Sequence, residues 1–220
     1  MNYIERMKQE WAKNFSNLQK NSKAFGLLSA GKMTIPQYRE IVRQIYHNTR
    51  VTPQLMAFST MFLKEESRGI AKTFFRHSLA ETGHDQLAKQ DYVALGGDGT
   101  QLANENFPSG AVAMNGAMVF LVQFVSPLCL LGYMFHLEYT PAQMGLAYID
   151  KLQSIGVPNE ALNFIIEHAE VDPSHVKLMD DYVAQMVRSE DDFKHVLYGM
   201  QVTNDLYGRL MDEAIDRASN

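Results

Sequence analysis

The chain has 220 residues, 46% of them hydrophobic and 20% charged, a balance typical of a globular protein with a core of its own. Its formal net charge of -5 argues against nucleic acid or an anionic membrane as a partner, because both attract basic surfaces. The single cysteine excludes an intramolecular disulfide, and the charged N-terminal segment lacks a secretory signal, so we expect a cytoplasmic protein.

Apolar side chains recur every three to four residues along most of the chain, which predicts helices. In chain order, the predicted helices cover about residues 3–24, 34–49, 66–95, 111–138, 140–156, 157–172 and 173 to the C-terminus. The segment from Gln101 to Gly110 is predicted to be a loop. The apolar stretch 111–135 is interrupted by polar residues and a proline, which favours a buried helix over a membrane span. The sequence therefore predicts an all-α bundle of roughly seven to nine helices, in one domain covering residues 1–220.

Three metal-binding side chains follow helical spacing in His168-x-x-x-Asp172-x-x-His175. Steps of four and seven residues return to within about 40° of the starting direction on a helix, so these side chains share one face. A mixture of imidazole and carboxylate ligands suits iron, manganese or zinc. The alternative is that Asp172 caps a new helix whose first residue is Pro173.

A second cluster consists of Glu81 and His84, which match the Glu-x-x-His unit of di-iron carboxylate proteins. The alternative is a solvated helix face, because charged residues surround the pair. Glu138 ends the most apolar predicted helix; if it is buried there, it needs a cation or a hydrogen-bond donor. The alternative is that Glu138 lies in solvent at the end of this helix. His136 lies two residues before Glu138 and therefore points to another face of the helix. The remaining histidines, His47, His77 and His195, are interpreted as ordinary polar or partly buried residues.

The sequence resembles the heme-oxygenase-like non-heme di-iron oxidases and oxygenases at six positions, in chain order: Glu81, His84, Glu138, His168, Asp172 and His175. The resemblance implies a heme-oxygenase-like (TenA-like) helical bundle that binds one or two Fe(II) ions per chain through these side chains. It also implies an O2-activating oxidoreductase whose substrate is a small organic molecule such as a carboxylic acid or an amine. We further expect a homodimer with no nucleic-acid or membrane partner.

The same fold includes relatives that need no metal, among them the thiaminase-II (TenA) group and the pyrroloquinoline-quinone synthases. Cys129 falls about where thiaminase II has its cysteine, but its leucine neighbours favour a core residue over a nucleophile. A TenA-like or cofactor-free enzyme, or a non-catalytic metal-binding module, is therefore the alternative. For the oxidase, the candidate substrate-binding residues lie on the helix before Glu138; they are Met118, Leu121 and Phe124. The alternative is that these side chains only pack in the hydrophobic core.

Overall fold

The computed structural model describes residues 2–219, with the exception of the side chains of residues 170–176. Within these residues the chain forms eleven α-helices, three short 3-10 helices and no strand, which confirms the predicted all-α class. In chain order the elements are α1 (Tyr3–Asn21), α2 (Lys23–Ser29), α3 (Ile35–Thr49), α4 (Thr52–Ser59), η1 (Thr60–Phe62), η2 (Glu65–Ile70), α5 (Ala71–Glu81), α6 (His84–Ala94), α7 (Gly99–Asn104), α8 (Ser109–Phe124), α9 (Cys129–Ser154), η3 (Asn159–Ala161), α10 (Asn163–Met186) and α11 (Glu190–Ala218).

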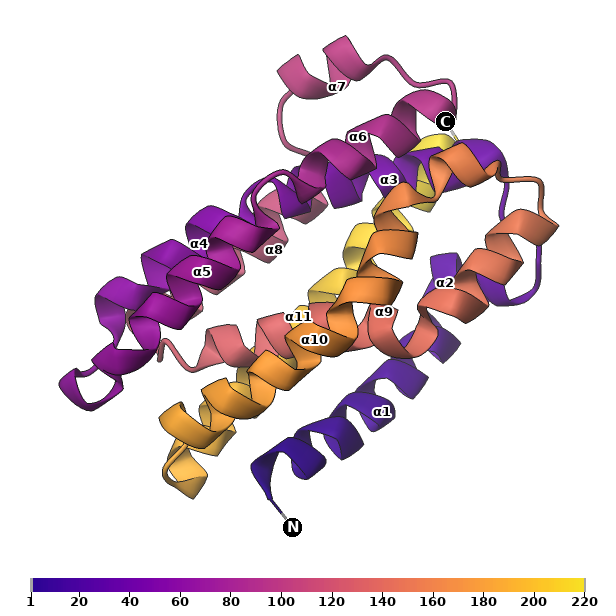
Figure 1. Ribbon diagram of the computed structural model, residues 1–220. Helices are drawn as coiled ribbons and strands as arrows, with labels where there is room; N and C mark the ends of the chain where they lie inside the picture. Colours follow the sequence, from indigo (N-terminus) through magenta and orange to yellow (C-terminus); the bar gives the residue numbers. More distant parts are fainter. Residues whose placement is uncertain (1, 220) are drawn as a thin grey trace.

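Helix α9 forms the centre of the bundle and packs most extensively against α10 and α11 (Figure 1). Every residue from Cys129 to His136 is buried, so the first two turns of α9 are surrounded by protein on all sides. Helix α6 packs against both α3 and α10, while α4 and α5 pack against each other. This arrangement brings the junction between α5 and α6 against the second turn of α10, where His168 lies.

Two glycines allow the backbones of α9 and α11 to touch. A Cβ atom at Gly132 would collide with the carbonyl oxygen of Val196, and one at Gly199 would collide with the carbonyl oxygen of Cys129. No rotation of a side chain relieves such a clash, because the obstructing atoms belong to the backbone. The close crossing of these helices therefore depends on both glycines.

The prediction of one helix over residues 66–95 is wrong. The segment divides into η2, α5 and α6, and the break between α5 and α6 falls at Thr82 and Gly83. Gly83 has a φ of 104°, a left-handed conformation that side chains other than glycine rarely adopt. Together with other divisions of this kind, the break raises the number of helices above the seven to nine expected.

Four further segments differ from the predictions. Residues 111–138 form no single helix, because α8 ends at Phe124 and α9 starts at Cys129. No helix restarts at Pro141; α9 continues through this proline, and it bends midway in Figure 1, as expected where a helix loses a backbone donor. Likewise α10 runs unbroken from Asn163 to Met186, so Asp172 does not cap a new helix. The loop expected over residues 101–110 contains most of α7.

One stretch, Gly99–Phe124, is long and apolar enough to cross a membrane by length and composition, with a mean hydropathy of 1.3. It comprises α7 and α8, which residues 105–108 separate. Helix α8 is buried on one side only: the side chains of Val112, Phe120 and Phe124 are 56%, 57% and 67% exposed. The feature is weak evidence for a membrane segment, because core helices of soluble proteins share it.

Candidate metal centre

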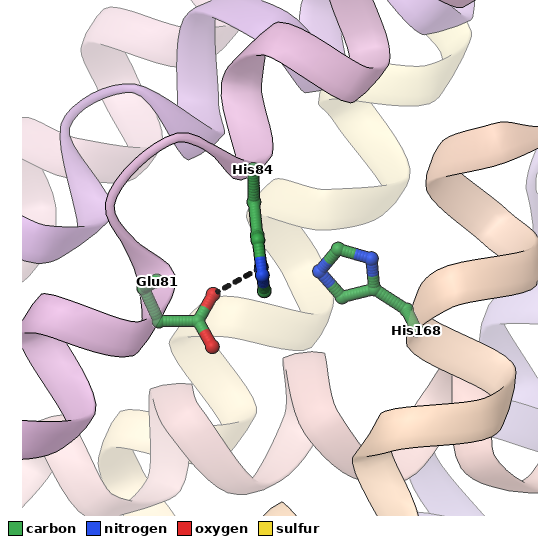
Figure 2. Close-up of side chains that lie close together, drawn as sticks. All are labelled: Glu81, His84 and His168. Atoms are coloured by element: carbon green, nitrogen blue, oxygen red, sulfur yellow. Dashed lines mark hydrogen bonds and ion pairs between the residues drawn. The ribbon is translucent and has the colours of Figure 1, made fainter.

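Glu81, His84 and His168 meet between the α5–α6 junction and α10 (Figure 2). Each side chain offers a ligand atom, and these three atoms lie within 4.8 Å of one another. Glu81 and His168 are buried, and His84 is half-buried. Residues up to 87 positions apart in the sequence (168 − 81) therefore present a carboxylate and two imidazoles to one point in the interior.

The spacing of Glu81 and His84 suggests that they share one helix face, but in the structure they lie on two different helices. Glu81 is the last residue of α5 and His84 is the first residue of α6, so they share no helix face. The left-handed turn at Gly83 redirects the chain between them, and Glu81 Oε2 lies 3.1 Å from His84 Nδ1. Figure 2 shows the two side chains on either side of this turn, both facing His168.

The backbone of α10 fixes the ring of His168. Its Nδ1–H donates a hydrogen bond of 2.7 Å to the carbonyl oxygen of Phe164, one turn earlier, and its ring stacks on that of Phe164. The other ring nitrogen faces Glu81 and His84 (Figure 2). A ligating histidine needs this tautomer, because the metal binds the nitrogen that carries no proton.

The start of α10 is tied in turn to α6 by Asp91, which is fully buried. Its carboxylate oxygens accept hydrogen bonds from the backbone N–H groups of Asn163 and Phe164, each 2.9 Å long. These donors have no partner within their own helix, so Asp91 acts as an N-cap supplied from another helix. The helix that carries His84 thus fixes the position of the helix that carries His168.

A second group of three ligand-competent side chains adjoins the first and shares Glu81 with it. Its other members are His77 and Glu138, both buried. His77 Nε2 lies 3.2 Å from Glu138 Oε1 and 3.6 Å from Glu81 Oε1. Glu138 is therefore inside the bundle and does not emerge into solvent. His77, which the sequence suggested to be an ordinary polar or partly buried residue, has an exposed fraction of 2% and belongs to this group. Its spacing of four residues before Glu81 is the signal that points to it.

The electrostatics of the site favour bound positive charge. Burial alone would raise the pKa of Glu81, but the nearby imidazoles of His77 and His84 outweigh it and bring the pKa well below its usual range. Burial lowers the pKa of His77, but the nearby carboxylates of Glu138 and Glu81 outweigh that effect and raise the pKa to about 9. The pKa of His168 is lowered by burial. An ionised Glu81 and a neutral His168 are the forms that bind metals.

The two groups adjoin a cavity of about 170 Å³. Glu81, Glu138 and His168 line one part of it, and most of the remaining wall is apolar. The apolar lining comes from α2, α3, α9, α10 and α11: Phe25, Leu28, Ile41, Val42, Tyr148, Leu152, Ile165, Leu210 and Met211. Engineered apolar cavities of similar size bind small organic molecules.

The expected substrate-binding residues lie elsewhere. None of Met118, Leu121 and Phe124 is among the described residues that line the cavity. Met118 and Leu121 are buried in the core, and Phe124 lies on the exposed side of α8. The cause is the break after Phe124, which separates α8 from the helix that carries Glu138.

Asp172 and His175 belong to α10, but their side chains lie outside the described residues, so their ligation stays a prediction. Cys129 is fully buried, and burial raises the pKa of its thiol to about 11. It is not among the described residues that line the cavity. These observations favour the core role predicted for Cys129. His47 lies apart from the site and contacts Glu105 at 2.9 Å.

The donor set fits a first-row transition metal such as iron. Two imidazoles and a carboxylate form the ligand face that recurs in non-heme iron proteins that activate O2. A cage for calcium or magnesium would consist of oxygen ligands instead. Burial favours a positive charge between the carboxylates of Glu81 and Glu138, a role that protonated His77 fills in this structure and that a bound metal would also fill.

Three solved structures share the fold over nearly the whole chain. A domain of unknown function with a heme oxygenase-like fold from Shewanella denitrificans OS217 has a TM-score of 0.88 and 19% identity, covering 100% of this chain and 94% of that one. A TenA homolog from Pseudomonas syringae pv. tomato DC3000 has a TM-score of 0.78, 9% identity and coverages of 98% and 93%. A TenA homologue from Pyrococcus furiosus has a TM-score of 0.73, 10% identity and coverages of 94% and 99%. They confirm the predicted heme-oxygenase-like fold.

Comparison with curated proteins yields no match. The family described as iron-containing redox enzymes matches residues 39–208, which include both groups of ligand-competent side chains. The match spans more than half of the chain and agrees with the predicted resemblance. The chain therefore belongs to the family of iron-containing redox enzymes.

Proposed function

We propose that this protein is an O2-activating non-heme iron oxidoreductase that acts on a small organic substrate. The observation that carries the proposal is the meeting of Glu81, His84 and His168 beside an apolar cavity. Three protein ligands on one side leave other positions of a bound metal open for O2 and substrate. Iron bound at these side chains would supply the electrons that reduce O2. One or two Fe(II) ions per chain agree with the two adjoining groups.

The protein residues have distinct roles in this proposal. Glu81 supplies the negative charge, and His168 supplies a neutral nitrogen whose tautomer is set by Phe164. His84 contributes the second imidazole from the start of α6. The apolar wall excludes water, so that oxidation is directed at the substrate and not at solvent.

The lining also bears on the class of substrate. The described residues of the cavity wall include no lysine or arginine. The charge of a carboxylic acid would therefore be balanced by the metal itself, and the body of the molecule would lie against the apolar wall. Asn48 and Thr52 line the cavity as well and offer an amide and a hydroxyl group to polar atoms of the substrate. These features support a small carboxylic acid or amine with an apolar body.

The thiaminase-II-like alternative has less support. It needs a reactive cysteine, whereas the pKa of the Cys129 thiol is raised to about 11 by burial. The backbone of Cys129 also contacts Gly199 of α11, which is a packing role. We therefore favour the metal-dependent function.

The test is anaerobic reconstitution with Fe(II), followed by measurement of bound iron and of O2 consumption with a panel of carboxylic acids and amines. We expect one or two irons per chain in the wild type. His168→Ala should weaken iron binding by about tenfold or more. His195→Ala is the matched control, because His195 lies on α11 outside both groups, and it should retain wild-type iron content. Equal iron content in the two variants, or an absence of bound iron in the wild type, would contradict the proposal.

A further inference from the structure

The second group differs from the first in how its histidine is supported. His77 lies on α5, one turn before Glu81, and its exposed fraction is 2%. Its Nε2 atom faces two carboxylates, those of Glu138 and Glu81, at 3.2 and 3.6 Å. Glu81 lies between the two groups: its Oε2 atom contacts His84, whereas its Oε1 atom faces His77.

Tyr182 of α10 contacts the opposite side of the His77 ring. The Tyr182 hydroxyl oxygen lies 3.2 Å from His77 Nδ1 and donates a hydrogen bond of 3.4 Å to the carbonyl oxygen of Thr73. Because the single hydroxyl proton is directed to Thr73, the oxygen accepts from His77 Nδ1–H. The two rings are also stacked, with an interplanar angle of 12°. Tyr182 is fully buried, so the arrangement is fixed by packing as well as by hydrogen bonding.

These contacts hold a proton on Nδ1 of His77. Nε2 is then the nitrogen that faces Glu138 and Glu81, and a metal bound there would take the place of the proton that Nε2 carries in the imidazolium form. Histidines that bind metals have the same outer partner, because the N–H that is not at the metal donates to a nearby oxygen. The hydrogen bonds from His77 to Tyr182 and from Tyr182 to Thr73 follow this pattern.

We propose that His77 is a ligand of a second metal position formed with Glu81 and Glu138, and that Tyr182 is its positioning residue. The inference rests on the proposed function for the identity of the metal, but it concerns a side chain outside the six that the resemblance implied. Glu81 then serves both metal positions through its two oxygens. The second position depends on α5, α9 and α10 together, whereas the first depends on the α5–α6 junction and α10.

The test is an anaerobic titration of the full-length protein with Co²⁺, whose visible absorption reports the number and type of ligands. The wild type should bind two equivalents in distinguishable steps. His77→Gln keeps a polar side chain of similar reach but removes the imidazole, and it should weaken the second step while leaving the first within about twofold. Tyr182→Phe removes one oxygen atom only and should weaken the second step by about tenfold, the lower end of the range for outer partners of metal ligands.

Two controls separate this inference from a general loss of structure. His47→Gln changes another fully buried histidine, one that contacts Glu105 outside both groups, and it should leave both steps unchanged. His84→Ala should weaken the first step more than the second. The altered Co²⁺ spectrum of the second step in Tyr182→Phe is a readout that a purely structural role would not produce.

The outcomes distinguish the inference from the proposed function. A single equivalent in the wild type, or a second step that His77→Gln and Tyr182→Phe leave unchanged, would overturn the role of His77 while the iron enzyme stands. Equal weakening of both steps in His77→Gln would also overturn it, because His77 would then support the whole site. A wild type that binds no metal would overturn both.

Discussion

Two buried histidines show that burial alone does not decide the charge of a residue in this protein. His136 is fully buried, neither ring nitrogen has a hydrogen-bond partner among the described residues, and its ring packs against Phe15 and Tyr207. Burial lowers its pKa to about 3. His77 is nearly as buried but faces Glu81 and Glu138, and its pKa is raised to about 9. The neighbouring carboxylates account for this difference.

His136 should make the folded protein sensitive to acid. Its pKa is about 3 in the folded protein and about 6.5 when the chain unfolds, so the unfolded chain binds the proton more tightly. The stability is therefore intact above pH 6.5 and is lost as the pH falls towards 3. In His136→Phe, urea unfolding at pH 7 and pH 4.5 should show a smaller acid-induced loss than in the wild type, by about 2–3 kcal/mol. Identical losses in both proteins would show that His136 is not buried in its neutral form.

The ligand-competent residues were only partly predictable from the sequence. Glu81, His84 and His168 stood out because their spacing matched a known ligand pattern. His77 has the same chemistry, but with Arg76 and Lys89 it belongs to the polar neighbours of Glu81 and His84 that indicate a solvated helix face. Which side of α5 faces inward is decided by its packing against α4 and by the contacts of Phe74 and His77 with Tyr182 of α10, and local charge does not reveal it.

At the scale of the elements, the positions of helices were predictable but their breaks were less so. Apolar periodicity continues across Gly83 and across residues 125–128, so the sequence favoured longer helices there. Conversely, Pro141 indicated a new helix, yet α9 tolerates it with a bend. A glycine or proline within an apolar stripe has several structural outcomes, and contacts with distant helices choose among them.

Gly83→Ala should weaken both the fold and the metal site. A residue with a side chain loses about 1–2 kcal/mol of folding free energy in the left-handed conformation. The added methyl group would meet no atom within 4 Å, so no new contact offsets this loss. Because the turn sets the directions of Glu81 and His84, metal binding should weaken as well. The matched control is Gly116→Ala in α8, which meets no atom within 4 Å and should stabilise the protein by about 0.5–1 kcal/mol. Urea unfolding and Co²⁺ titration measure both effects; stabilisation by Gly83→Ala would contradict the prediction.

Gly199→Ala and Gly132→Ala should each be strongly destabilising. The added methyl group meets backbone atoms of the opposing helix, so α9 and α11 must move apart. Overpacking of a core costs typically about 1–3 kcal/mol, and we expect the upper end of this range because no side chain can yield. Thermal unfolding of each variant beside Gly116→Ala provides the measurement. A wild-type midpoint in Gly199→Ala would mean that the two helices are farther apart than in this structure.

At the scale of the whole molecule, the site brings together helices that lie far apart along the sequence. The α5–α6 junction supplies Glu81 and His84, and α9 and α10 supply Glu138 and His168. Asp91 adds a further connection between α6 and α10. A metal at this point would therefore link both sides of the cavity, and its binding energy would be coupled to folding.

Metal loading should accordingly raise the melting temperature. Free metal at a hundred times its dissociation constant stabilises the folded state by about 2.7 kcal/mol. For a protein of this size, each kcal/mol shifts the midpoint by about 2–4 °C, which predicts a rise of about 5–11 °C on adding Co²⁺. His168→Ala should lose most of this increment and His195→Ala should keep it. An equal rise in both variants would indicate binding elsewhere on the chain.

The separation of His84 from His168 by 84 positions also has a consequence for the newly made protein. Ribosomes add about 5–20 residues per second, so the second imidazole emerges about 4–17 s after the first. During this interval the nascent chain displays Glu81 and His84 without the helix that completes the site. Under the proposed function, the three-ligand site would therefore form, and bind its metal, only after α10 has been synthesised.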